Sequence, residues 1–172
     1  MRIGVMCSGN GSNFENIVRS VTKHEVVLMI HNTKVCGAAM RAEKLGIPHC
    51  RVKAKHEDQM IKLFEAWHVD LIVLAGYMRV IKNPDKFPAP IINVHPSLLP
   101  KYKGLHAVEQ AMESGDKVTG CTVHYVNEEL DGGEIIKQAE VPIFENDTVE
   151  ELTKRIQREE YRILPEVINT LS

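Results

Sequence analysis

The sequence lacks any apolar run that approaches the ~20 residues of a membrane-spanning helix. No signal peptide precedes Arg2, so we expect a cytoplasmic protein with no membrane partner. The four cysteines, Cys7, Cys36, Cys50 and Cys121, are widely scattered and form no C-x-x-C pair. Because most of them lie in apolar runs, we expect reduced core side chains rather than a disulfide framework or a metal site.

An excess of charge of one sign is also missing. Lysine and arginine number 21 against 23 aspartates and glutamates, a net charge of −2, which gives no electrostatic reason to expect nucleic acid binding. The 172 residues suffice for a full hydrophobic core, and no internal repeat, low-complexity tract or long linker divides them. We therefore predict a single domain over residues 1–172.

Strand and helix patterns alternate along the chain. The predicted strands cover residues 2–7, 26–30, 47–52, 71–75, 91–94, 119–126 and 134–141. The predicted helices cover residues 13–21, 37–45, 56–67, 107–114 and 149–171, and we expect Pro165 to kink the last one. Continuous apolar strands between helices indicate a parallel sheet covered on both faces, while the last two strands follow each other closely enough to pair antiparallel. The sequence thus predicts a Rossmann-like α/β fold with a mostly parallel, twisted sheet and an antiparallel edge.

A glycine-rich loop, Ser8–Asn13, follows the first predicted strand. Its glycines let the backbone approach an anion, and the helix start predicted at the Ser12 cap directs free N–H groups at the same place. The full dinucleotide pattern needs a glycine at position 14, where the chain has Phe14, and no G-K-[ST] follows. We predict a phosphate site, with a tight turn that binds nothing as the alternative for the loop alone.

An amide, an imidazole and a carboxylate are predicted to meet near the end of a later strand. Asn93 and His95 flank one residue there, so their side chains share a face, and Asp131 follows 36 residues after His95 in a glycine-rich turn. An amide can hold negative charge that develops on oxygen, and an imidazole oriented by a carboxylate can pass a proton. Each motif alone has a structural alternative, but at one sheet edge they favour acyl transfer.

Two further histidines, His106 and His124, raise the question of a metal site. They lie 11 and 29 residues after His95, without an H-x-x-x-H pair or a carboxylate at ligand spacing. We therefore predict no metal. His124 lies on a predicted strand that can reach the cleft and His106 lies at a helix start, so both are candidates for supporting the trio.

The chain resembles the folate-dependent formyltransferases over nearly its whole length. The string Asn-x-His-Pro-Ser-Leu-Leu-Pro at 93–100, with Leu-Asp-Gly-Gly at 130–133, is typical of these enzymes and of their hydrolase relatives. Ser-Gly-Asn-Gly-Ser-Asn at 8–13 and Lys-Tyr-x-Gly-Leu-His at 101–106 narrow the resemblance to the branch that formylates glycinamide ribonucleotide in purine biosynthesis. The resemblance implies an enzyme that uses 10-formyltetrahydrofolate as a co-substrate and needs no metal.

The resemblance also implies roles for individual residues. Asn93, His95 and Asp131 match the catalytic trio. Ribonucleotide binding is assigned to Gly11, Ser12, Asn13 and Glu160. Folate binding is assigned to Met78, Arg79, Val80, Ile81, Asn93, Asn127, Glu128, Glu129, Leu130 and Asp131. The N-terminal half is therefore expected to bind the ribonucleotide phosphate, and the C-terminal half the folate.

The sequence departs from the family pattern at one position, and it leaves three alternative functions open. Relatives carry a folate-contacting arginine near positions 54–60, where this chain has none; Lys53, Lys55 and His56 are candidates to replace it. A methionyl-tRNA formyltransferase would need an RNA-binding extension and a basic surface. A formyltetrahydrofolate hydrolase would use water in place of the amine, and a non-catalytic protein would bind a phosphate ligand alone. We expect small-molecule partners and a monomer or homodimer.

Overall fold

Apolar segments form the strands of the computed structural model, which describes residues 1–34 and 36–171. The strands are β1 (Arg2–Cys7), β2 (Glu25–His31), β3 (His49–Arg51), β4 (Leu71–Leu74), β5 (Ile91–His95), β6 (Val118–Tyr125) and β7 (Ile135–Pro142). The helices are α1 (Ser12–Ser20), α2 (Gly37–Leu45), α3 (Glu57–Ala66), α4 (Ala107–Glu113) and α5 (Val149–Thr170), with a short 3-10 helix at Pro84–Lys86. None of the helices in these described ranges combines the length and apolarity needed to cross a membrane.

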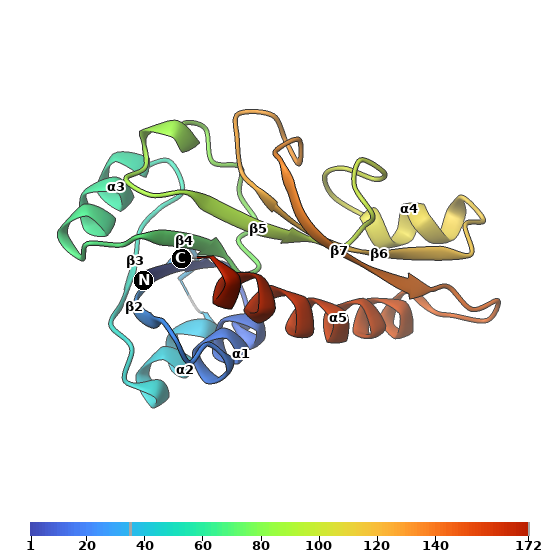
Figure 1. The fold of residues 1–172 in the computed structure, drawn as a ribbon, viewed down its shortest axis with the longest axis horizontal. Helices are drawn as coiled ribbons and strands as arrows, with labels where there is room; N and C mark the ends of the chain where they lie inside the picture. The colour runs from blue at the N-terminus through green and yellow to red at the C-terminus, as the bar shows by residue number, and fades with distance from the viewer. Residues whose placement is uncertain (35, 172) are drawn as a thin grey trace.

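One seven-stranded sheet runs through the molecule in the order β3-β2-β1-β4-β5-β6-β7 (Figure 1). The pairs from β3 to β5 are parallel, and β6 pairs antiparallel with both β5 and β7. The predicted α/β fold with an antiparallel edge is thereby confirmed. Since the carboxyl ends of parallel strands meet at one edge, the loops after β1, β2, β4 and β5 converge there.

Two hydrophobic cores, one on each face of the sheet, hold the layers together. Phe14 of α1 and Ile156 of α5 are fully or almost fully buried in the first core, together with alanines of α2. Phe64 of α3 is fully buried in the second. Figure 1 accordingly shows α1, α2 and α5 on one side of the sheet and α3 on the other. Helices on both faces leave the sheet edge as the place for a ligand.

The long C-terminal helix continues through Pro165 as far as Thr170, although a break or kink is the usual effect of proline in a helix. Proline has no N–H to donate, so the carbonyl of Tyr161 loses its helical partner. Asn16 of α1 supplies the replacement, because its Nδ2 donates to the Tyr161 carbonyl at 2.8 Å. The same contact fastens α5 to α1, beside the glycine-rich loop.

A short turn before α5 is fastened by an ion pair. Both terminal nitrogens of Arg155 donate to the Asp147 carboxylate at 2.8 Å, and the backbone N of Phe144 donates to the same carboxylate at 2.7 Å. The Arg155 guanidinium also lies 4.2 Å above the centre of the Phe144 ring. The hydrogen bonds from Arg155, followed by that from Phe144, lower the pKa of Asp147 to about 2.

Replacing Asp147 with asparagine is expected to lower the free energy of unfolding at neutral pH, and the deficit should shrink in acid. The folded-state pKa lies below the ordinary value, so the stabilising effect is fully present above about pH 4. It is lost as the pH falls through about 2. Urea unfolding of both proteins at pH 7, 4 and 2.5 measures this, with Glu140→Gln on the exposed face of β7 as the control. A deficit independent of pH would contradict it.

Candidate active site

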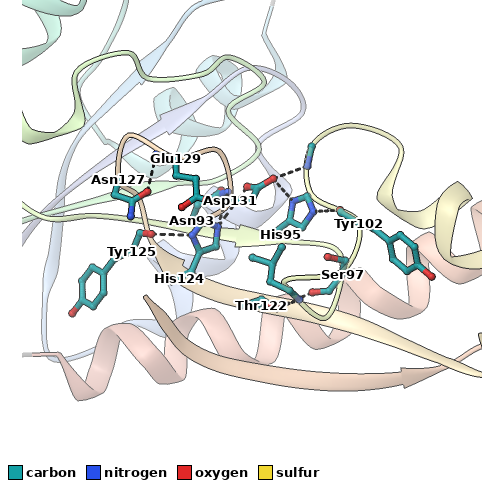
Figure 2. A network of polar contacts seen from close by, with 12 residues as sticks. Asn93, His95, Ser97, Tyr102, Thr122, His124, Tyr125, Asn127, Glu129 and Asp131 are labelled. Atoms are coloured by element: carbon teal, nitrogen blue, oxygen red, sulfur yellow. Dashed lines mark hydrogen bonds and ion pairs between the residues drawn. The ribbon is translucent and has the colours of Figure 1, made fainter. Parts of the chain in front are cut away.

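Three predicted side chains converge at the carboxyl end of β5. Asn93 and His95 lie two residues apart on β5, and the residues opposite them on the antiparallel strand β6 are His124 and Thr122. Asp131 comes from the loop between β6 and β7. Figure 2 shows Asn93, His95, His124 and Asp131 facing one another. The structure therefore brings the predicted trio together and places His124 within the same cluster.

The His95 ring is engaged through both of its nitrogens. Nε2 lies 2.8 Å from the backbone oxygen of Tyr102. Because a carbonyl oxygen can only accept, Nε2 carries a proton and donates it. Nδ1 lies 3.6 Å from Oδ2 of Asp131, and both side chains are almost fully buried. Nδ1 is therefore the nitrogen that can gain or lose a proton, and it faces a carboxylate.

The carbonyl that orients this imidazole belongs to a sharply bent segment after β5. Tyr102 has a φ of 54°, a left-handed conformation that is unfavourable for a residue other than glycine. Thr122 of β6 holds the segment, because its hydroxyl donates to the Ser97 carbonyl at 2.7 Å and accepts from the Leu99 N–H at 3.1 Å. The Tyr102 hydroxyl donates to Asp116 at 2.6 Å. These bonds fix the carbonyl where the imidazole meets it.

The Asp131 carboxylate lies between two imidazoles (Figure 2). Its Oδ2, which faces His95, accepts a hydrogen bond from the Gly104 N–H at 2.7 Å. Its Oδ1 lies 3.7 Å from Nε2 of His124. Asp131 itself has a φ of 50°, so the turn that carries it is held in the left-handed region. The carboxylate is thus positioned by the segment after β5 as well as by its own loop.

His124 is placed to orient the amide of Asn93. The Nδ1 of His124 lies 2.9 Å from the carbonyl of Tyr125, so Nδ1 is the donor. Burial, the largest effect, lowers the pKa of His124, although the Tyr125 carbonyl and the Asp131 carboxylate act in the opposite direction. The neutral ring then presents a lone pair on Nε2, and Nδ2 of Asn93 lies 3.5 Å from it. This contact leaves the second N–H of the amide for a ligand.

The glycine-rich loop forms the other half of the site. Gly11 has a φ of 78°, and a Cβ at this position would lie 2.5 Å from the backbone of Ala38 in α2, so the turn requires glycine. α1 begins directly after it, with its free N–H groups at the strand edge. Oδ1 of Asn13 is buried and has no hydrogen-bond partner among the described residues. An unpaired buried acceptor beside a helix start is consistent with a ligand site.

The prediction that Ser12 caps α1 with its side chain is wrong. Gly11 occupies the cap position, and Ser12 is the first helical residue. The Ser12 hydroxyl instead lies 2.7 Å from the hydroxyl of Tyr161 on α5. The neighbouring Glu160 is the predicted ribonucleotide residue, and burial raises the pKa of its carboxyl to about 8. α5 therefore brings Tyr161 to α1 from a distant part of the sequence, whereas the carboxyl of Glu160 lies near Cys121 of β6.

The predicted folate loop after β4 is mostly exposed. Met78 and Val80 have about two thirds of their surface in solvent, whereas Ile81 is buried. The carboxylate of Glu57, at the start of α3, accepts hydrogen bonds from the backbone N–H groups of Lys82 at 2.7 Å and Asn83 at 3.1 Å. The far end of the loop is thus fixed by an acidic side chain that the sequence did not single out.

An open cavity of about 750 Å³ lies between the segment that follows this loop, residues 84–91, and residues 125–129. It is lined by Pro84, Asp85, Phe87, Pro88, Ala89, Pro90, Ile91, Tyr125, Val126, Asn127, Glu128 and Glu129. Three predicted folate residues, Asn127, Glu128 and Glu129, contribute to its wall, whereas residues 78–81 and 130–131 do not. The segment 84–91 was not predicted to contribute, and its only sequence signal is a run of prolines that excludes a regular helix.

Other predicted residues lie apart from the cluster. His106 is exposed at the start of α4, and no hydrogen bond joins its ring to the trio in the described part of the chain. Lys53 and Lys55 are exposed, and His56 precedes α3. Within residues 1–34 and 36–171, no group of three or more histidine, cysteine, aspartate or glutamate side chains is arranged to hold a metal ion.

The fold is that of the formyl-group transferases. The family model described as formyl transferase matches residues 1–168, and the chain belongs to this family. The resemblance noted in the sequence is thereby confirmed.

Within this family, the chain is similar to proteins named for glycinamide ribonucleotide formylation or for purine biosynthesis. The phosphoribosylglycinamide formyltransferase of Haemophilus influenzae is 39% identical over 180 residues, which cover 97% of this chain and 85% of that protein. A trifunctional purine biosynthetic protein of Gallus gallus is 37% identical over all of this chain, but over only 18% of its own length. The crystal structure of glycinamide ribonucleotide transformylase 1 from Symbiobacterium toebii has a TM-score of 0.94 at 40% identity, covering 98% of this chain and 86% of that one.

Proposed function

We propose that this chain transfers the formyl group of 10-formyltetrahydrofolate to the amine of 5′-phosphoribosylglycinamide, a step of purine biosynthesis. The observation that carries the proposal is the cluster of Asn93, His95 and Asp131, with the His95 and Asp131 side chains almost fully buried, at the same strand edge as the glycine-rich loop. The full-length similarity to a phosphoribosylglycinamide formyltransferase supports the choice of acceptor. We also propose a single domain acting in the cytoplasm on small molecules without a metal.

In this mechanism, the amine nitrogen attacks the formyl carbon that is bound to N10 of the folate. The resulting tetrahedral adduct carries negative charge on the former carbonyl oxygen. The N–H of Asn93 that is not directed at His124 donates to this oxygen, and one such donor contributes ~3–4 kcal/mol to the transition state. A protonated His95 beside the Asp131 carboxylate adds positive charge close by.

Collapse of the adduct requires one proton to move. The attacking amine loses a proton, the bond between the formyl carbon and N10 breaks, and N10 receives a proton as tetrahydrofolate leaves. Nδ1 of His95 and the Asp131 carboxylate, 3.6 Å apart, form the proton path, with water between them and the substrates. No covalent bond to the enzyme forms. Holding both substrates in one cleft supplies a further ~7–11 kcal/mol of the barrier reduction.

Two separate binding regions serve the substrates in this proposal. Gly11, Ser12 and Asn13 bind the ribonucleotide phosphate at the start of α1, and Glu160 contacts the same ligand from α5. The pteridine lies between the loop after β4, residues 78–81, and the loop 127–131. The amine and the formyl group then meet at Asn93, between the two regions.

A three-way acceptor assay tests the function. The purified protein is given 10-formyltetrahydrofolate with glycinamide ribonucleotide, with methionyl-tRNA, or with water alone. Formylation of the ribonucleotide alone is the expected result, followed as release of tetrahydrofolate and by mass of the formylated product. Tetrahydrofolate released in water alone at the same rate would assign a hydrolase, and formylation of the tRNA would assign the other transferase. Binding of the ribonucleotide without turnover would leave a binding protein.

A further inference from the structure

Ser8, the residue that follows β1, is buried and has every polar group in a hydrogen bond. Its N–H donates to the carbonyl of Gly76 at 3.1 Å, and its carbonyl accepts from the Thr33 hydroxyl at 2.6 Å. Its own hydroxyl donates to Oδ1 of Asn32 at 2.7 Å and accepts from the backbone N–H of Met78 at 2.8 Å. One small side chain thus joins the carboxyl ends of β1, β2 and β4.

The partners of Ser8 belong to both proposed substrate regions. Gly76 and Met78 lie in the loop after β4, which is proposed to hold the pteridine. On the other side, Ser8 directly precedes the glycine-rich loop that is proposed to hold the phosphate. The adjacent Gly9 is itself anchored, because its carbonyl accepts from the backbone N–H of Ala38 at 3.1 Å. The Ser8 hydroxyl is therefore the side-chain link between the two loops.

The Ser8 hydroxyl has a fixed donor role toward Asn32 and a fixed acceptor role toward Met78. A hydroxyl has one proton, which Ser8 gives to Asn32, so the oxygen can only accept from the Met78 N–H. A ligand that orders residues 9–13 also restricts Ser8, and Ser8 in turn restricts the backbone at Met78. Ordering one loop thereby lowers the cost of ordering the other, which is a source of positive cooperativity between two ligands.

We propose that Ser8 is a positioning residue that couples the two substrate sites, so that a bound ribonucleotide raises the affinity for the folate through the hydrogen bond from Met78 to the Ser8 hydroxyl. This inference rests on the proposed function, because it takes the two ligands from it. Ser8 touches neither reacting atom, and its effect is on the arrangement in which the folate meets the ribonucleotide.

Two other residues provide matched controls within the same region. Glu57 also holds the folate loop, through Lys82 and Asn83, but among the described residues it has no hydrogen bond to the glycine-rich loop. Its removal should loosen the folate loop without affecting the coupling. Thr33 donates to the Ser8 carbonyl and does not reach Met78. Thr33→Val therefore removes a hydrogen bond from the same residue while leaving the link intact.

The test measures binding of tetrahydrofolate by calorimetry, with and without saturating glycinamide ribonucleotide. Tetrahydrofolate is the product of the proposed reaction and carries no formyl group, so no turnover takes place during the measurement. The ratio of the two affinities is the coupling factor, expected at about fivefold or more in the wild-type protein. In Ser8→Ala the factor should fall toward 1. In Glu57→Ala the folate should bind more weakly, but the coupling factor should not change. In Thr33→Val the folate affinity and the coupling factor should both equal those of the wild type.

Three results would overturn the proposal. The first is a coupling factor of 1 in the wild-type protein, and the second is a coupling factor in Ser8→Ala equal to that of the wild type. The third is an equal fall of the coupling factor in Ser8→Ala and in Glu57→Ala. If Ser8→Ala does not fold, Asn32→Ala removes the acceptor that orients the same hydroxyl and should lower the factor in the same direction. Formyl transfer by the wild-type protein is measured in parallel. A protein that transfers no formyl group refutes the proposed function, whereas an active protein without coupling refutes only the role of Ser8.

Discussion

Replacing His95 with alanine is expected to lower kcat by about 10²–10⁴-fold, the range found when a positioned proton-transfer group is removed. The ring supplies both the proton path through Nδ1 and the positive charge beside the oxyanion, and no other imidazole can replace it. His124 is nearest, but its Nδ1 is committed to the Tyr125 carbonyl and its pKa is lowered by burial. Initial rates of formyl transfer at saturating substrates measure the loss.

Binding of the ribonucleotide should survive this replacement, because the glycine-rich loop follows β1, whereas His95 lies on β5. Calorimetry with glycinamide ribonucleotide therefore separates loss of chemistry from loss of structure. His68→Asn is the control, since His68 is exposed in the turn before β4, at the end of that strand away from the site. Near-normal turnover in His95→Ala, or an equal loss in His68→Asn, would contradict the assignment.

The sequence predicted the strands and their arrangement because the signal is local. Four consecutive apolar residues at Leu71–Leu74 are buried on both faces of the sheet, and such a continuous run is typical of a central strand in a parallel sheet. The same local rule placed Asn93 and His95 on one face of β5. The parallel pairing and the edge where the loops meet then followed from the alternation of strands with helices, whereas the order of the strands in the sheet came from the structure.

What the sequence could not give are contacts between residues far apart in the chain. The role of His124 depends on the register of β5 against β6, which puts it opposite Asn93, and a shift by one residue would turn it to the other face. Likewise, Ser12 was expected to cap α1, but Tyr161 engages its hydroxyl from 149 residues away. Local patterns carry no information on such pairings.

The same limit applies to backbone partners. The carbonyl that fixes the proton on His95 belongs to Tyr102, where the chain takes a positive φ. Tyrosine has no special preference for this conformation, so the sequence gives no hint of it. The bonds from Thr122 that hold the segment come from another strand. The trio could thus be named from its residue types, whereas the atoms that orient it required the structure.

Replacing Asn93 with alanine should lower kcat by about 10²–10³-fold, the usual effect of removing one donor to an oxyanion. The loss should appear in kcat more than in KM, because the negative charge exists only after the amine has attacked. Asn93→Asp is a sharper probe, since it keeps the size and replaces the donor with a second carboxylate near Asp131. It should be at least as slow as the alanine variant at neutral pH.

The position of His124 allows a graded comparison with the same assay. If His124 orients the amide through its Nε2, then His124→Ala should also lower kcat, but by less than Asn93→Ala, because the amide remains in place with more freedom. Replacing both residues should cost little more than Asn93→Ala alone, since the histidine then has nothing to orient. Additive losses in the double variant would show that His124 acts on the reaction by a separate route. An active Asn93→Ala enzyme would remove the amide from the mechanism.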